Sequence, residues 1–385
     1  MKAFVLDATW DPRPDYSLSP VERDTRRALI GSSVWRHPRG AFKDVDDPSP
    51  GPEDVIIGQR RVGFCGSDLH FFETDRDGYI KYPGLTRFPT ILGHEFAGEV
   101  VEIGSDVTGI GIGEPVTIED MVRCGTCYPC RTNRPNHCEN LDEIGFSLDG
   151  GFAEYVRVPA RNCWPISAIR QRVSNDGELF DCGALVEPFT VVYNAIVHAA
   201  GGVTPGAFAA VFGAGPIGLA AVALLRTSGA ARIVVFEVSP ERRRLALTLG
   251  ADSTHDPRTV KADEVVMGET HGAGADLLIE AAGAFADTFP AMQSSVALTG
   301  TILVIGRDAA HVSIFPEPLQ VKRTRVVFAK GNAGMGTYPH VLRLMAAGRI
   351  DPLLMITGRY PFVRIEDALS ASKGRAHGKI LVDVA

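Results

Sequence analysis

The feature that most constrains the fold is a glycine-rich turn between a short apolar run and a helix-like segment, within AFAAVFGAGPIGLAAVALLRTSGAARIVVFE. Residues 207–212 are apolar and few, as in a buried strand of a parallel sheet. The spacing that follows is G-x-G-x-x-G, which in this strand-turn-helix context is typical of a turn that binds a dinucleotide. We assign five residues of this turn to cofactor binding: Gly213, Gly215, Pro216, Ile217 and Gly218.

The expected cofactor is NAD, because a carboxylate ends the next strand-like run, RIVVFE. Glu237 can accept hydrogen bonds from a ribose diol, and its charge would repel the 2′-phosphate of NADP. Three arginines begin at Arg242 in SPERRRLALTLG, and they could instead serve a 2′-phosphate. Their amphipathic pattern favours a solvated helix face, yet we count Arg242 among the cofactor residues.

The rest of the chain divides into two kinds of pattern. Strand-like runs at 275–283, 300–306 and 324–332 alternate with helical stretches after the glycine turn, which predicts a doubly wound parallel sheet. The front of the chain has many short strand-like runs broken by Gly and Pro, which predicts a mostly β domain. The fold class is therefore α/β, with two domains expected for 385 residues.

Composition and charge exclude several classes of partner. A net charge of −7 argues against nucleic acid as a partner. No apolar run approaches the length of about 18–20 residues that a membrane span needs, so we expect no membrane partner. The N-terminus MKAFVLDATWDP lacks the apolar core of a signal peptide, and we expect a cytoplasmic protein.

Four of the seven cysteines lie in the segment 122–140, with the spacing C-x2-C-x2-C-x7-C. Four thiolates complete a tetrahedral zinc shell and leave no position for substrate, so we predict a structural zinc lobe. An iron–sulfur cluster is the alternative, but the ferredoxin-type run has a shorter last gap and a following proline, where Glu139 stands here. The predicted ligands are Cys124, Cys127, Cys130 and Cys138.

A second, open zinc site is predicted from GFCGSDLH and GHEFAGEV. Cys65, His94 and Glu95 offer one thiolate, one imidazole and one carboxylate, a set that suits catalytic zinc with one position left for substrate. Glu187, in LVEP, is expected to be a fourth ligand or to hold the metal-bound water. As an acid in the first turn of a helix, Glu187 is equally well explained by the helix dipole.

Together these motifs, in this order, resemble the zinc-dependent medium-chain dehydrogenase/reductase family, with GGFAEYV and the terminal GKILV as further matches. The resemblance implies a GroES-like catalytic domain at 1–189 and 332–385, and a Rossmann NAD-binding domain at 190–331. It also implies two zinc ions per chain and a homodimer or homotetramer.

The family's mechanism implies roles for further residues. Catalytic zinc would act as a Lewis acid on an alcohol that delivers hydride to the nicotinamide. By position, Ser67 and His70 correspond to the family's proton relay. Asp68 would orient His94 or the metal, and we also count it among the candidate substrate contacts.

The motifs CGSDLH and LVEP resemble the sorbitol and threonine dehydrogenase branch, and two longer segments resemble inosose and aminocyclitol-type dehydrogenases. These segments are an insertion at 8–34 and a long interval between Cys65 and His94. We expect oxidation of a secondary alcohol on a polyhydroxylated ring, such as a cyclitol, an inosose or an aminoglycoside-type sugar. An open-chain polyol or L-threonine is the alternative substrate, and a non-catalytic dinucleotide-binding protein is the alternative of another class. Candidate substrate contacts in the longer interval are Phe72, Glu73 and Tyr79.

Overall fold

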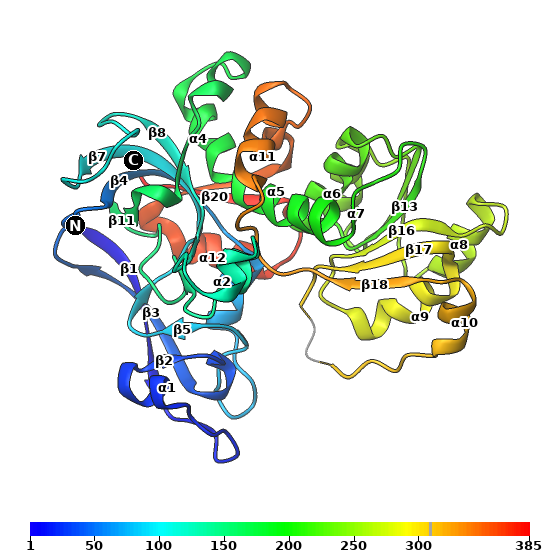
Figure 1. Cartoon of the computed structure of the whole chain (residues 1–385), viewed down its shortest axis with the longest axis horizontal. Coiled ribbons are helices and arrows are strands. Elements are labelled where there is room, and N and C mark those ends of the chain that lie inside the picture. Colours follow the sequence, from blue (N-terminus) through cyan, green and yellow to red (C-terminus); the bar gives the residue numbers. More distant parts are fainter. Residues whose placement is uncertain (308–309) are drawn as a thin grey trace. The chain divides into compact units, whose positions relative to one another are not determined.

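The computed structural model describes residues 1–307 and 310–385, and the chain forms two compact units (Figure 1). The first unit comprises Met1–Glu187, Gly358–Lys373 and Ile380–Ala385. The second comprises Pro188–Thr357 and Gly374–Lys379.

A seven-stranded antiparallel sheet organises the first unit, with strand order β12-β8-β7-β4-β20-β19 and β11 paired to β4. In β11 exposed and buried residues alternate, because one face of the strand packs on the core and the other meets water, and in β19 half-buried and exposed residues alternate. The strands are β4 (Asp54–Gly63), β7 (Glu95–Ile103), β8 (Pro115–Ile118), β11 (Tyr155–Pro159), β12 (Cys163–Pro165), β19 (Ile356–Pro361) and β20 (Lys379–Asp383).

A smaller sheet, of order β3-β1-β6, and the pair β2–β5 complete the β structure next to this core. These strands are β1 (Lys2–Trp10), β2 (Arg27–Ala28), β3 (Trp35–Asp44), β5 (Thr86–Arg87) and β6 (Thr90–Ile91). The helices of this unit are α1 (Pro20–Thr25), α2 (Gly66–Phe72), α3 (Tyr128–Arg131), α4 (Asp176–Ala184) and α12 (Ile365–Lys373), and α5 (Val186–Tyr193) begins in it.

The 8–34 insertion is ordered by hydrogen bonds around one buried carboxylate. Ser19 caps α1 in a capping box with Glu22, which is 1% exposed. The Glu22 carboxylate also accepts hydrogen bonds from the Tyr16 hydroxyl at 2.8 Å and from the Leu29 amide at 2.9 Å. The insertion then joins the longer Cys65–His94 interval through the β2–β5 pair.

A parallel six-stranded sheet organises the second unit, with order β15-β14-β13-β16-β17-β18. Its central strands are apolar and buried along their length, since helices cover both faces (Figure 1). The strands are β13 (Phe208–Phe212), β14 (Arg232–Phe236), β15 (Ser253–His255), β16 (Ala275–Glu280), β17 (Val296–Val304) and β18 (Arg325–Phe328). The helices are α6 (Pro216–Thr227), α7 (Pro240–Thr248), α8 (Ala262–Glu269), α9 (Phe285–Ser295), α10 (Pro316–Val321) and α11 (Thr337–Ala346).

This strand order places a topological switch point at β13. From β13 the sheet extends to one side through β14 and β15, and to the other side through β16, β17 and β18. In open α/β sheets a ligand binds outside the carboxyl ends of the strands at such a point. The glycine turn follows directly after β13. The predicted α/β class and the Rossmann order of the sheet are confirmed.

The division into units differs from the predicted domains at 188–189, at 374–379 and, over the longest stretch, in the segment 332–357. The predicted boundary assigned this segment to the first domain, but it packs within the second unit. His340 of α11 stacks on Tyr193 with ring centroids 5.6 Å apart, and the Thr227 hydroxyl donates to the Arg349 carbonyl at 2.8 Å. These contacts join residues far apart in the sequence. The predicted boundary was placed at the end of the strand-like run 324–332, where the sequence gives no sign of them.

In the described part of the chain, one helical stretch, Asp176–Ala199, is long and apolar enough to cross a membrane. However, 83% of its most apolar window is buried within the protein, as is common for core helices of soluble proteins.

Candidate active site: two metal centres and a nucleotide-binding turn

The first candidate metal centre forms where β4 passes into α2. Cys65 precedes the helix, and the carboxylate of Asp68 returns to accept a hydrogen bond from the Cys65 amide at 2.9 Å. His94 and Glu95 reach the same place from the start of β7, after Gly93, whose φ of 91° suits glycine. The ligand atoms of Cys65, His94 and Glu95 all lie within 4.8 Å of one another.

The surroundings of His94 favour a cation. The side chain is 3% exposed and its ring packs on Phe146 at 4.5 Å between centroids. Burial lowers the pKa of His94, but the nearby Asp68 and Cys65 outweigh burial and raise this pKa well above its usual value. Sulfur, nitrogen and oxygen donors in one buried cluster are a set that zinc accepts, so these residues fit a zinc ion.

The Asp68 side chain lies behind the metal ligands and is not exposed to solvent. It is fully buried, and its Oδ1 lies 3.5 Å from His94 Nδ1 while its Oδ2 holds the Cys65 amide. His94 Nε2 is thereby the nitrogen left for a metal, and the Ser67 hydroxyl lies 3.4 Å from it. The structure therefore brings Ser67 to the site, and it supports Asp68 as the residue that orients His94.

Glu187 is 5% exposed at the start of α5, and its carboxylate is not among the three mutually close ligand groups. Its predicted role as fourth ligand or water holder stays a prediction. His70 lies on α2, one turn beyond Ser67 and 34% exposed in its side chain.

The second candidate metal centre is the cysteine lobe. The sulfurs of all four predicted ligands lie within 4.8 Å of one another. Backbone amides point at two of the sulfurs: the Cys124 amide lies 3.3 Å from Cys138 Sγ, and the Cys127 amide 3.4 Å from Cys124 Sγ. The lobe is closed by β9 (Met121–Val122) paired with β10 (Asp142–Glu143). This arrangement fits a four-thiolate zinc.

The thiols of the lobe differ in how readily they lose their protons. Hydrogen bonds, first from Thr126 and then from the Cys127 amide, lower the pKa of Cys124 to about 5. Burial and the neighbouring Cys127 raise the pKa of Cys130 to about 12. A divalent cation removes this conflict, because all four sulfurs can then be thiolates.

In the second unit, the three glycines of the turn meet three different steric demands. A Cβ on Gly218 would lie 1.9 Å from the Gly213 carbonyl oxygen, so the helix can approach the strand only with glycine here. Gly213 has φ of 94° and would meet the Ala282 backbone at 2.7 Å. Around Gly215, which caps α6, the nearest atom to an added Cβ belongs to Arg242, at 3.8 Å. That space is open to a pyrophosphate.

Glu237 follows β14 and is 6% exposed. Its carboxylate accepts hydrogen bonds from the amides of Ala214 at 2.7 Å and Ser239 at 2.8 Å, which ties it to the glycine turn. Arg242 lies beside the turn and donates from Nε to the His377 carbonyl at 2.8 Å. Burial lowers the pKa of Arg242, so this side chain is partly enclosed and not on a solvated face.

Comparisons with known proteins agree with this arrangement. A family described as "Alcohol dehydrogenase GroES-like domain" matches residues 51–168, and one described as "Zinc-binding dehydrogenase" matches residues 216–347. Scyllo-inosose 3-dehydrogenase of Thermotoga maritima is 42% identical over 359 residues, which are 90% of this chain and 91% of that protein. The chain belongs to the zinc-dependent alcohol dehydrogenase family.

Another relative is named for a different substrate. L-threonine 3-dehydrogenase of Pyrococcus furiosus is 34% identical, over 88% of this chain and 93% of that protein. The solved structure of a protein from Thermotoga maritima, assigned to the alcohol dehydrogenases, covers 100% of both chains with a TM-score of 0.95 and 39% identity. The predicted family is thus confirmed, and the chain is an oxidoreductase.

Two solved structures of similar proteins contain a nicotinamide cofactor. A zinc-binding dehydrogenase from Sinorhizobium meliloti, 28% identical with a TM-score of 0.78 over 99% of both chains, is bound to NADP. An alcohol dehydrogenase from Escherichia coli CFT073 is complexed with NADH; it is 25% identical with a TM-score of 0.78, over 99% of this chain and 100% of that one. The family is described as zinc-binding, and these two structures contain NADP and NADH, so zinc and NAD are consistent with the comparisons.

A cavity of about 680 Å³ adjoins the carboxyl ends of β13 and β14, where it is lined by Gly213, Phe236 and Glu237. Arg258 also lines it and donates to the Val238 carbonyl at 3.0 Å. Sequence reasoning missed Arg258, because HDPR follows no motif and only the β15 pairing brings it beside Glu237. The cavity has the place and the lining of an adenosine site.

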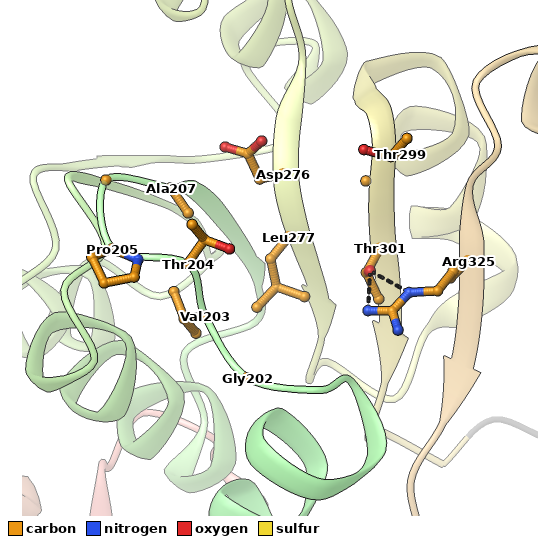
Figure 2. Close-up of a pocket in the computed structure, with 12 residues that line it drawn as sticks. Gly202, Val203, Thr204, Pro205, Ala207, Asp276, Leu277, Thr299, Thr301 and Arg325 are labelled. Carbon is orange, nitrogen blue, oxygen red and sulfur yellow. Dashed lines mark hydrogen bonds between the residues drawn. The ribbon is translucent and has the colours of Figure 1, made fainter.

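A different hollow, of about 400 Å³, lies near the amino ends of β13, β16 and β18 and beside residues 299–301 of β17 (Figure 2). Its cationic residue, Arg325, donates to the Thr301 hydroxyl and to the Ala200 carbonyl, so this guanidinium supports the edge of the sheet. Since dinucleotides bind at the opposite edge of such sheets, this hollow is separate from the cofactor site.

Three of the predicted substrate contacts pack against other residues of the first unit, and their role towards substrate stays a prediction. Asp68 is buried behind the metal ligands. Phe72 packs on Phe4 in the core of the first unit. Tyr79 is 5% exposed, with the guanidinium groups of Arg13 at 3.9 Å and Arg36 at 4.9 Å from its ring centroid. Glu73 is the exception, since it lies at the end of α2 near His70.

Proposed function

We propose that the protein oxidises a secondary alcohol on a polyhydroxylated ring, a cyclitol of the inosose type, to a ketone with zinc and NAD. The observation that carries this proposal is the 42% identity to scyllo-inosose 3-dehydrogenase over 90% of the chain. The half-buried Cys65 with the buried His94 and Glu95 supports the reaction type, because such a set of donors leaves a position for a hydroxyl. Aminoglycoside-type rings share this polyol chemistry and are a narrower form of the same proposal.

The chain's own residues would share the chemistry as follows. Cys65, His94 and Glu95 would hold the catalytic zinc, which when bound lowers the pKa of a substrate hydroxyl. Asp68 holds the His94 imidazole in one orientation. Ser67 would accept a hydrogen bond from the reacting hydroxyl and His70 would receive its proton, while the carbon-bound hydrogen leaves as hydride to NAD.

An assay of NADH formation tests the proposal. The zinc-loaded protein is supplied with NAD and, in turn, with scyllo-inosose, myo-inositol, an aminocyclitol, sorbitol and L-threonine. We expect the highest kcat/KM with a cyclitol, and no turnover after Cys65→Ala. A preference for sorbitol or L-threonine would keep the reaction and replace the substrate, an outcome favoured by the threonine dehydrogenase relative.

No NADH formation with any of these compounds, with zinc and NAD both bound, would instead favour a non-catalytic dinucleotide-binding protein. We further propose that the enzyme works in the cytoplasm as a homodimer or homotetramer, without nucleic-acid or membrane partners. Sedimentation of the zinc-loaded protein tests the subunit number.

A further inference from the structure

Three ionisable side chains follow one another from the end of α2 towards solvent. His70 Nδ1 lies 3.4 Å from Glu73 Oε2, and the same oxygen lies 3.5 Å from Lys81 Nζ. The side chains are 34%, 24% and 52% exposed for His70, Glu73 and Lys81. The carboxylate therefore stands between the imidazole and an ammonium group.

The backbone fixes this arrangement. The Lys81 amide donates both to the His70 carbonyl at 3.0 Å and to the Glu73 carbonyl at 2.9 Å, which brings the returning strand of the 73–82 loop against the helix end. The far side of the loop is anchored as well. Asp75 accepts the Tyr79 amide at 3.0 Å and forms an ion pair with Arg13 of the 8–34 insertion.

We propose that Glu73 is a positioning residue for His70 and that Lys81 moderates its effect. This inference rests on the proposed function, in which His70 receives the proton of the substrate hydroxyl. A carboxylate at Nδ1 holds the proton on that nitrogen and leaves Nε2 as the acceptor, as second partners do for catalytic imidazoles. The same negative charge stabilises the protonated imidazole, and the positive charge of Lys81 offsets part of that stabilisation.

Other charges surround α2 and set the starting point of the His70 titration. Besides the 73–82 loop, α12 and β3 pack against the helix. The charged or titratable residues on these elements, besides Glu73 and Lys81, are Asp75, Arg76, Asp77, Tyr79 and Tyr82 in the loop, Glu366, Asp367 and Lys373 on α12, and Arg36, His37, Arg39, Lys43 and Asp44 on β3, with Asp68 on α2 itself. They are unchanged in Glu73 and Lys81 variants, so their contributions cancel when variants are compared with the parent protein.

The test measures the titration of His70 directly, by NMR of the zinc-loaded protein with ¹³C-labelled histidines. His70→Asn identifies the signal by its loss. Glu73→Gln should lower the midpoint of the His70 titration by about 0.5 to 1 pH unit, and Lys81→Met should raise it by about 0.3, as expected for partly exposed charges. Shifts of opposite sign in the two variants would indicate an electrostatic effect on His70, because a merely structural disturbance would not produce them.

Matched controls come from the same loop. Arg76 is 93% exposed in its side chain and pairs with Asp77 at 3.7 Å. Arg76→Met and Asp77→Asn remove one charge of each sign without touching His70, and should leave its midpoint unchanged within about 0.1 pH unit, since exposed charges at longer range are screened. Glu73→Asp, which keeps the charge but shortens the side chain, should lie between the parent and Glu73→Gln.

Turnover gives the second readout. In NAD-linked oxidation of the best cyclitol, the acid limb of the kcat/KM profile should move in the same directions as the NMR midpoint. Equal midpoints in the parent, Glu73→Gln and Lys81→Met, or shifts of the same sign, would overturn the inference. The NMR result needs no substrate, so shifts of opposite sign in a protein that oxidises no cyclitol would count against the proposed function alone.

Discussion

Asp68→Asn is the most informative single change at the proposed catalytic centre. The substitution keeps the shape of a fully buried side chain and removes its charge. The amide oxygen of asparagine can still accept the Cys65 hydrogen bond of 2.9 Å, which leaves its NH₂ group to face His94 Nδ1. An NH₂ group must find an acceptor there, so Nδ1 loses its proton to Nε2. The nitrogen that should bind zinc then carries hydrogen.

The expected size of the effect follows from this contact. Loss of a carboxylate behind a histidine ligand typically weakens metal binding 10- to 100-fold. That range corresponds to about 1.4–2.7 kcal/mol of binding free energy. Because the Asp68 carboxylate also raises the pKa of His94 in the absence of metal, part of the lost affinity is regained at low pH, where the parent imidazole must give up a proton to bind.

Zinc affinity is measured by competition with a chromogenic chelator, and the cysteine lobe supplies an internal reference in the same molecule. We expect one zinc per chain to become exchangeable in Asp68→Asn while the other is retained. Asp149→Asn is the matched control, because Asp149 likewise accepts a backbone amide, that of Ile91 at 3.0 Å. Parent-like affinity at both sites in Asp68→Asn would refute the assigned role of Asp68.

Two further changes separate the metal centre of the lobe from the cofactor site. Cys127→Ser should remove the zinc of the lobe and lower Tm by about 5 °C or more in differential scanning calorimetry, since a structural zinc stabilises the folded chain directly; an unaltered Tm with lost activity would reverse the roles of the two sites. Glu237→Ala should weaken NAD relative to NADP about tenfold in fluorescence titrations, because a charged acceptor for the ribose diol is lost; an unchanged ratio would clear Glu237 of that role.

The glycine turn could be predicted from the sequence because its demands are local. Gly218 is fixed by its approach to the Gly213 carbonyl five residues earlier, and Gly213 by its positive φ, whereas the approach of Gly213 to Ala282 is a long-range contact that the motif alone does not show. The cysteine lobe is local in the same sense, since its ligands lie within 15 residues and are closed by the short β9–β10 pair. The open metal site required more than spacing, and its prediction depended on the donor types of Cys65, His94 and Glu95 taken together.

The sequence does not show which side chains of the longer interval find partners far along the chain. Tyr79 lies in a polar, aromatic stretch whose composition is typical of a pocket lining. In the structure the guanidinium groups of Arg13 and Arg36 pack on its ring. Neither arginine has a periodic pattern or motif that points to residue 79. The predicted domains differ from the compact units at 332–357 for a related reason, since the amphipathic α11 shows an apolar face without showing which unit receives it.

These long-range contacts also change how the two longer segments should be understood. Taken singly, each is a surface elaboration that could be shortened without cost to the core. In the structure they form one body, joined by the β2–β5 pair and by the Arg13–Asp75 ion pair. That body ends in the hydrogen bonds from the Lys81 amide to the end of α2. Removing the 8–34 insertion should therefore disturb Glu73 and Lys81, and through them His70, although no residue of the insertion has been placed at either metal centre.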